Sequence, residues 1–203
     1  MRLALCISFL LVIVQTSRAQ EARPTKTLIN GGGSLNTKHV GLVLAPSFDI
    51  TKMACVSTTV FGLRGGINLK DKFSLGAFFK TAINEIRPSS ESTSNFYMDY
   101  KVWGGFAEYT VLSKKIIHLT FPIYLGYGEV EMDNELGDLR LGDANFFHIE
   151  PSALLEINLH KNVRVNIGSG YRVITSMTYR NLSNADLSGL VGHMGLKFGI
   201  FKK

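Results

Sequence analysis

A two-residue alternation of apolar and polar side chains recurs along most of this 203-residue chain. The alternating stretches are rich in Val, Ile, Phe, Tyr and Thr and are separated by Gly, Asn, Asp and Ser, whereas helical periodicity is nearly absent. Eight stretches stand out, at 39–46, 54–68, 73–86, 96–112, 116–131, 145–159, 163–176 and 187–201. The pattern predicts an all-β protein with eight strands.

The connections between these stretches alternate in length. Leu69-Lys70-Asp71, Ser113-Lys114-Lys115 and His160-Lys161-Asn162 are short, and a further short link is expected near 47–53. The remaining links are longer and polar, with the sequences RPSSESTSN, MDNELGDLRLGDA and TYRNLSNADL. Tight turns at one end and longer loops at the other are typical of outer-membrane barrels.

The two faces of each expected strand distinguish a membrane barrel from a soluble one. On the stretch 163–176, one face carries Val165, Ile167 and Tyr171, and the other carries Arg164 and Arg172 with two glycines between them. Inside a narrow barrel glycine makes room for long neighbours, and charges can pair away from lipid. The facing therefore predicts an eight-stranded antiparallel up-and-down transmembrane β-barrel. Aromatic residues near the strand ends of the outward face fit girdles at the two interfaces: Trp103, Tyr109, Tyr127, Phe147, Tyr171 and Phe198.

The N-terminus has the features of a secretory signal peptide. A short positive start precedes an apolar run of about a dozen residues, which is too short for a membrane helix of roughly 20. Ser17 and Ala19 predict cleavage before Gln20. We expect a signal peptide at 1–19, a flexible periplasmic leader at 20–37 and an outer-membrane β-barrel at 38–203.

Closing the sixth hairpin through the link 160–162 would pair Leu159 with Val163. Glu150 would then lie opposite Arg172 on the inner face, as an expected ion pair. This arrangement predicts a structural ion network in the lumen, although perturbed carboxylates can also mark an acid/base site.

The same register sets Leu154 against Gly168 and Asn158 against Arg164, which brings Arg164 close to Glu156. By the same parity Arg64 and Glu108 also point inward. The expected interior network comprises Arg64, Glu108, Glu150, Glu156, Arg164 and Arg172.

The last strand carries a terminal motif. His193-x-Gly195-x-x-Phe198-x-Ile200 matches the polar-x-Gly-x-x-apolar-x-apolar signal of bacterial outer-membrane barrels, although Lys202 and Lys203 follow it. Together with HLTFPIYLGYG, FFHIEPSALLEINL, SGYRV and DLSGLVGHMGLKFGIF, the motif resembles a family of small, largely uncharacterised outer-membrane β-barrel-domain proteins of the OmpA and OmpX type. The resemblance implies that the barrel assembly machinery reads this strand.

Three classes of function remain open. The first is a non-enzymatic barrel with a structural role or an unknown extracellular ligand bound by its loops. The second is a narrow channel for small solutes, which the interior charges would obstruct. The third is a lipid-modifying barrel enzyme, which would need a histidine beside an outward Ser57 or Thr59, and none is placed there.

Other chemistry has little support. Removing Arg2 and Arg18 leaves 20 basic and 16 acidic residues, a net charge of +4 that does not favour nucleic acid as a partner. Cys55 is alone in the mature chain, so no internal disulfide is expected. The five histidines show no metal-ligand spacing. We therefore expect no catalytic site, cofactor or metal, with the bilayer of the outer membrane as the main partner.

Overall fold

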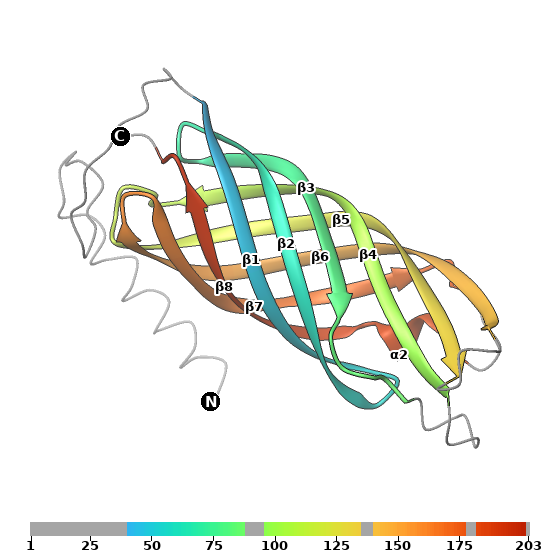
Figure 1. Ribbon diagram of the computed structural model, residues 1–203. Coiled ribbons are helices and arrows are strands. Elements are labelled where there is room, and N and C mark those ends of the chain that lie inside the picture. Colours follow the sequence, from blue (N-terminus) through green and yellow to red (C-terminus); the bar gives the residue numbers. More distant parts are fainter. Residues whose placement is uncertain (1–39, 88–95, 135–139, 178–181, 202–203) are drawn as a thin grey trace, which may run out of the picture.

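The protein is described here by a computed structural model covering residues 40–87, 96–134, 140–177 and 182–201. These residues form eight antiparallel strands that close into a barrel, each strand pairing with its chain neighbours and β8 returning to β1 (Figure 1). The strands are β1 (Val40–Met53), β2 (Val56–Leu69), β3 (Phe73–Ala82), β4 (Phe96–Val111), β5 (Ile117–Asn134), β6 (Arg140–His160), β7 (Val163–Thr175) and β8 (Gly189–Gly199). The predicted all-β, eight-stranded barrel is confirmed, while residues 1–37 lie outside the described part.

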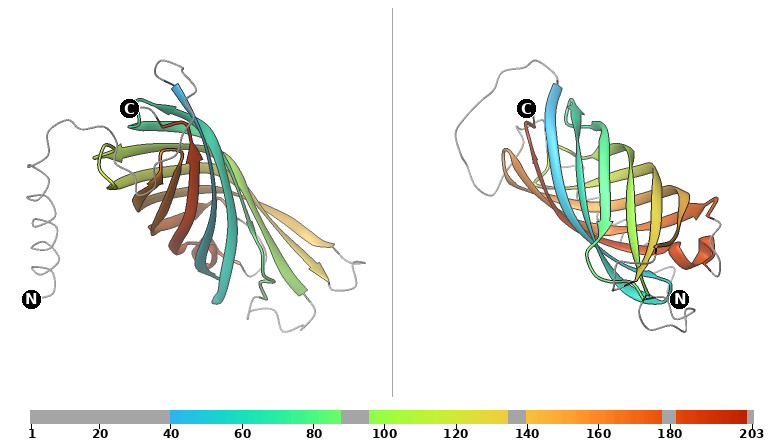
Figure 2. Two further views of the ribbon diagram at one scale, coloured as in Figure 1. Left: turned by 60° about the vertical axis from the view of Figure 1, so that its left-hand side comes forward. Right: turned by 45° about the vertical axis from the view of Figure 1, so that its right-hand side comes forward.

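The links between consecutive strands alternate between the two ends of the barrel (Figures 1 and 2). The β2–β3, β4–β5 and β6–β7 turns share the end near the C-terminus, called here the turn end. The other end, the loop end, holds a short helix, α2 (Asn184–Leu187), between β7 and β8. No helix among the described residues is long and apolar enough to cross a membrane.

The first expected link is wrong. Residues 47–53 belong to β1, and the chain turns at Ala54 and Cys55, both with positive φ. Asp49 and Thr51 interrupt the apolar run because they face the interior, where polar residues are accommodated. Their polarity reflects the lumen and not a loop.

The pairing of β6 with β7 has the predicted register except at the turn. Leu154 lies opposite Gly168 and Asn158 opposite Arg164, but a register shift next to the turn pairs His160, and not Leu159, with Val163. The predicted hairpin closure is therefore one residue too long, and the shift absorbs the difference.

The outward face forms an apolar belt around the barrel. On β5 it runs from Ile117, which is 53% exposed, to Tyr127, which is 47% exposed. The ten steps from Ile117 to Tyr127, at about 3.3 Å each and tilted by about 40°, span about 25 Å of height, which matches the apolar band of membrane barrels.

Two aromatic rows cross the outer face, one within the belt on β5 and one at its loop-end edge. The row nearer the turn end pairs Phe73, Tyr109 and Phe121 across β3, β4 and β5. The row nearer the loop end pairs Phe79, Trp103, Tyr127 and Phe147 across β3 to β6. Aromatic rings are favoured near membrane interfaces, so the loop-end row fits one edge of the belt.

The interior has two zones. Its middle and turn-end parts are polar, whereas the loop-end part is an apolar plug that the two-residue alternation does not predict. In the plug the Tyr100 and Phe146 rings stack with centroids 5.6 Å apart, and a Cβ on Gly128 would collide with the Phe146 ring. Members of the plug include Met53, Ile86, Met98, Tyr100, Val102, Val130, Phe146, Ile174, Met177 and Leu187.

The helix α2 fixes the plug from the loop end. Leu187 is fully buried in it, and the Ala54 amide donates to the carbonyl of Asp186 at 2.7 Å. The Met177 amide donates to Asn184 Oδ1 at 3.0 Å, which ties the segment before the loop to the helix. The interior is therefore covered at this end by packed side chains.

Candidate functional site

The middle of the interior holds an ion cluster, the central cluster, from four strands: Asp49 of β1, Lys80 of β3, Glu150 of β6 and His193 of β8. Lys80 Nζ lies 2.8 Å from Asp49 Oδ2 and 2.5 Å from Glu150 Oε1. His193 bridges the same carboxylates, with Nδ1 2.8 Å from Asp49 Oδ1 and Nε2 3.4 Å from Glu150 Oε1. All four side chains are buried.

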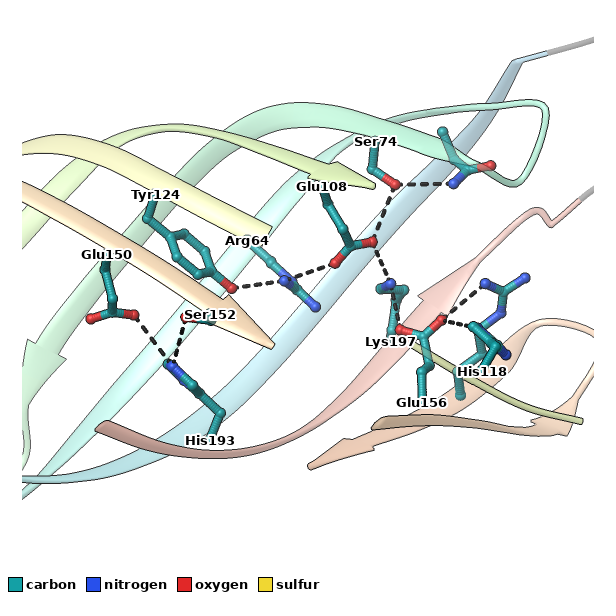
Figure 3. Close-up of polar contacts among 12 residues, drawn as sticks. Arg64, Ser74, Glu108, His118, Tyr124, Glu150, Ser152, Glu156, His193 and Lys197 are labelled. Atoms are coloured by element: carbon teal, nitrogen blue, oxygen red, sulfur yellow. Dashed lines mark hydrogen bonds and ion pairs between the residues drawn. The ribbon is translucent and has the colours of Figure 1, made fainter. Parts of the chain in front are cut away.

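A second cluster, the turn-side cluster, lies nearer the turns (Figure 3). Lys197 Nζ of β8 bridges two carboxylates, at 2.6 Å from Glu108 Oε1 on β4 and 2.5 Å from Glu156 Oε2 on β6. Glu156 Oε1 also accepts a hydrogen bond from Arg164 Nη1 at 2.9 Å and lies 2.9 Å from His118 Nε2. One buried carboxylate thus interacts with groups from three other strands.

Arg64 and Tyr124 connect the two clusters. Arg64 Nη1 lies 3.1 Å from Glu108 Oε2 and donates to Tyr124 Oη at 2.7 Å. The Tyr124 ring lies 4.5 Å from Lys80 Nζ, so the ammonium also interacts with its π face. Together the two clusters hold four carboxylates and four permanent cations, so the network is neutral when its histidines are uncharged.

Arg172 stands apart from this network. Its Nε donates to the carbonyl of Leu187 at 2.6 Å and its Nη2 to Thr51 Oγ1 at 3.1 Å, while its guanidinium lies over the Tyr100 ring. The carboxylate of Glu150 is bound instead by Lys80 and His193. The predicted Glu150–Arg172 ion pair is therefore wrong, although both side chains face inward.

The structure brings five of the six expected network residues into the two clusters, Arg172 being the exception. The expected network lacks Asp49, Lys80, His118, Lys197 and the linking Tyr124, and it lacks His193, which the sequence places only in the assembly motif. Lys197 carried a usable signal, because it shares the inward parity of the last strand with His193. Asp49 was missed because it fell inside the expected first link.

No protein-family model matches the sequence, and no curated protein matches it either. Solved structures do match. The crystal structure of Neisserial surface protein A is similar with a TM-score of 0.57 and 12% identity, covering 80% of this chain and 97% of that one. Ail, the attachment invasion locus protein of Yersinia pestis, is similar with a TM-score of 0.51 and 11% identity, covering 80% of this chain and 99% of that one. This chain has the fold of an eight-stranded outer-membrane barrel.

In this outer-membrane-type barrel, Ser152 extends the central cluster. Its Oγ lies 3.1 Å from His193 Nε2, and His193 Nδ1 lies 2.8 Å from Asp49 Oδ1. This order of serine, histidine and aspartate resembles a catalytic triad, in which the histidine is the base and the aspartate orients it. However, Glu150 shares the same His193 nitrogen, Lys80 already neutralises Asp49, and Ser152 is only 8% exposed. The arrangement fits a packed network better than a reacting nucleophile.

The central cluster also gathers metal-ligand atoms. Asp49, Glu150 and His193 each offer one such atom within 4.8 Å of the others. Lys80 Nζ lies between the two carboxylates, so an ammonium already provides the positive charge that a metal would supply.

No histidine of the described residues lies beside an outward serine on the barrel's outer face. Among the described histidines, His118, His148 and His193 point into the interior, and His160 lies beside a turn. A lipid-modifying site therefore lacks its base within the described part of the chain.

The residues of the expected assembly motif lie along the β1–β8 seam. Gly195 faces Ser47, and Phe198 lies opposite Leu44 with its ring on the outer surface. Ile200 follows the strand, and its amide donates to the carbonyl of Leu42 at 2.9 Å. His193 is occupied in the central cluster once the barrel has closed.

Strands β4, β5 and β6 continue past the loop-end aromatic row and form a projecting ridge (Figures 1 and 2). The outward face of this ridge changes from apolar to charged, with Asp99 and Lys101 on β4 opposite Glu131 and Glu129 on β5. Lys101 Nζ lies 3.4 Å from Glu131 Oε2. The charged outward face of the ridge therefore suits an aqueous environment beyond the loop-end edge of the belt.

Proposed function

We propose that the protein is a non-enzymatic outer-membrane barrel that binds a partner outside the cell through its loop end. On this proposal residues 1–19 direct export, the terminal motif is read by the barrel assembly machinery, and the turns face the periplasm. The names of two similar barrels, a surface protein and an attachment protein, agree with such a role.

The observation that carries the proposal is the contrast between a filled interior and an extended exterior. The ion network and the apolar plug occupy the lumen with buried side chains, which disfavours solute passage. The ridge of β4–β6 instead holds a polar surface beyond the belt on paired strands. A rigid scaffold that presents loops is a common basis for recognition.

The test removes the tip of the ridge without opening the barrel. Val130 and Ala144 lie opposite each other on β5 and β6, so residues 131–143 can be replaced by Asn-Gly as a two-residue hairpin turn. We expect the shortened protein to keep its heat-modifiable gel migration. In nanodiscs, its binding to a panel of immobilised extracellular proteins and polysaccharides should fall at least tenfold against the intact barrel.

A double Lys70→Gln, Lys72→Gln variant at the turn end serves as the control and should bind as the intact barrel does. Binding that survives removal of the ridge would refute recognition through the loop end. Steady single-channel conductance of the intact barrel in a planar bilayer would favour the narrow channel instead.

A further inference from the structure

The turn end carries lysines in all three of its turns. Lys70 and Lys72 belong to the β2–β3 turn, Lys114 and Lys115 to the β4–β5 turn, and Lys161 to the β6–β7 turn. Lys70, Lys72 and Lys114 are exposed and take no part in the ion pairs found among the described residues. We call these five residues the lysine collar.

The described residues of the three turns hold one acidic residue, Asp71, against the five lysines of the collar. Asp71, the acidic residue of the β2–β3 turn, is buried, and its amide is bound by Asn68 Oδ1 at 3.0 Å. The loop end differs, because Lys101 lies among Asp99, Glu129 and Glu131 on the ridge. The described barrel is therefore electrically asymmetric along its axis, with positive charge concentrated at the turn end.

The height of the collar relative to the belt narrows the choice of partner. Lys72 directly precedes Phe73, an outward ring of the aromatic row at this end. Lys114 follows two residues after Leu112, which is 43% exposed, and Ile117 resumes the belt three residues later. Each residue of strand adds only about 3.3 Å, so these lysines lie close to the apolar edge.

A lysine at this height can lay its methylene chain along apolar surface and place its ammonium among lipid headgroups. Lysines near a membrane surface attract anionic lipids, and the attraction decays within a Debye length. A partner located further away, such as the cell wall, would require groups that project beyond the turns, whereas the described turns are short and tight.

We infer that the lysine collar binds the phosphates of anionic phospholipids in the leaflet on the turn side. This inference rests on the proposed insertion in a membrane and adds a preferred lipid class to it. The collar would also favour one orientation of the barrel, because the acidic ridge would be repelled by the same leaflet.

The test measures lipid selectivity by spin-label electron paramagnetic resonance, with spin-labelled phosphatidylglycerol and phosphatidylcholine and the full mature barrel in phosphatidylcholine bilayers. We expect phosphatidylglycerol to be preferred by roughly fivefold, with a preference that decreases in 1 M salt. The triple variant Lys70→Gln, Lys72→Gln, Lys114→Gln should lose most of it. The matched control, Lys52→Gln with Lys101→Gln at the loop end, should keep it.

Replacing the same three turn lysines by arginine should preserve the preference, since the charge is kept. Heat-modifiable migration separates the possible failures. A barrel that does not insert would refute the proposed function, whereas a folded, inserted barrel without lipid selectivity would refute the collar alone. An equal loss of phosphatidylglycerol preference in the loop-end control would refute the collar and assign the selectivity to net charge. Sedimentation with purified peptidoglycan that depends on the turn lysines, without any lipid preference, would refute the lipid assignment and make the cell wall the partner.

Discussion

Replacing Lys197 by methionine should destabilise the barrel more than the removal of any exposed lysine. The substitution keeps an unbranched side chain of similar length and removes only the ammonium. In the folded barrel Lys197 is 2% exposed, and its Nζ lies 2.6 Å from Glu108 Oε1 and 2.5 Å from Glu156 Oε2.

The magnitude follows from these two interactions. Each charge-assisted hydrogen bond contributes about 1.5–3 kcal/mol, and removing one partner of a buried ion pair costs about 3–5 kcal/mol. Glu108 keeps Arg64 at 3.1 Å and Glu156 keeps Arg164 at 2.9 Å, so the loss should lie near the lower limit, about 3 kcal/mol.

A second substitution tests whether charge balance is the cause. Glu108→Gln in the Lys197→Met background restores neutrality and leaves Arg64 with its hydrogen bond to Tyr124. The double variant should therefore be more stable than the sum of the single effects predicts, by at least about 1.5 kcal/mol.

The free energy of unfolding can be measured by reversible urea titration in lipid vesicles, with heat-modifiable gel migration and the fluorescence of Trp103, the single tryptophan, as readouts. Lys114→Met at the exposed β4–β5 turn is the matched control and should change stability by less than about 0.5 kcal/mol. Additive effects of Lys197→Met and Glu108→Gln, or a loss no larger than that of the control, would refute the reasoning.

Three further outcomes are expected. Ile123→Arg within the belt should cost about 2–4 kcal/mol of refolding free energy. Asn145→Arg, which is outward on the ridge opposite Glu129, should cost less than about 1 kcal/mol. Equal costs would contradict a bilayer around the belt. Phe146→Ala should cost about 3–5 kcal/mol in the same titration, because it removes packing from the plug. An unchanged urea midpoint would mean that the plug is not packed in the membrane-inserted barrel. Cys55 should react with a membrane-impermeant maleimide on intact cells, whereas a cysteine at Lys70 in a Cys55→Ser background should react only after the outer membrane is opened; the reverse pattern would invert the orientation.

The alternation in the sequence was sufficient to predict the architecture, because residue parity directly determines which side chains meet lipid and which meet the lumen. It could not predict where a strand ends when the interior is polar. The polar Asp49 and Thr51 of β1 predict a link at 47–53, and this wrong link excludes Asp49 from the expected network.

Register predicts which residues lie opposite each other but not where long side chains reach. Arg172 extends toward the loop end, where the carbonyl of Leu187 accepts its hydrogen bond, while Lys80 comes from the other side of the barrel to Glu150. Such cross-lumen partners depend on barrel closure, which no single hairpin encodes.

Residue parity also does not predict which inward positions tolerate an arginine. Parity alone would make Tyr124 a permissive inward position for arginine. In the barrel Tyr124 is 5% exposed and lies against Arg64 and Lys80, so a further cation there would meet two others. Outward residues on the ridge are the better controls.

The position of Lys197 on the final strand affects which alignment of that strand is most stable. Before β8 docks, Glu108 and Glu156 on β4 and β6 lack the ammonium that bridges them in the closed barrel. A slip of β8 by two residues would keep the outward parity of Leu190, Met194, Leu196 and Phe198, yet it would bring Gly195 or Gly199 to that place. Hydrophobic patterning cannot detect such an error, whereas the missing ammonium leaves the buried cluster with one excess negative charge, which is costly. The charge balance of the lumen therefore favours the alignment of the last strand that places Lys197 between Glu108 and Glu156.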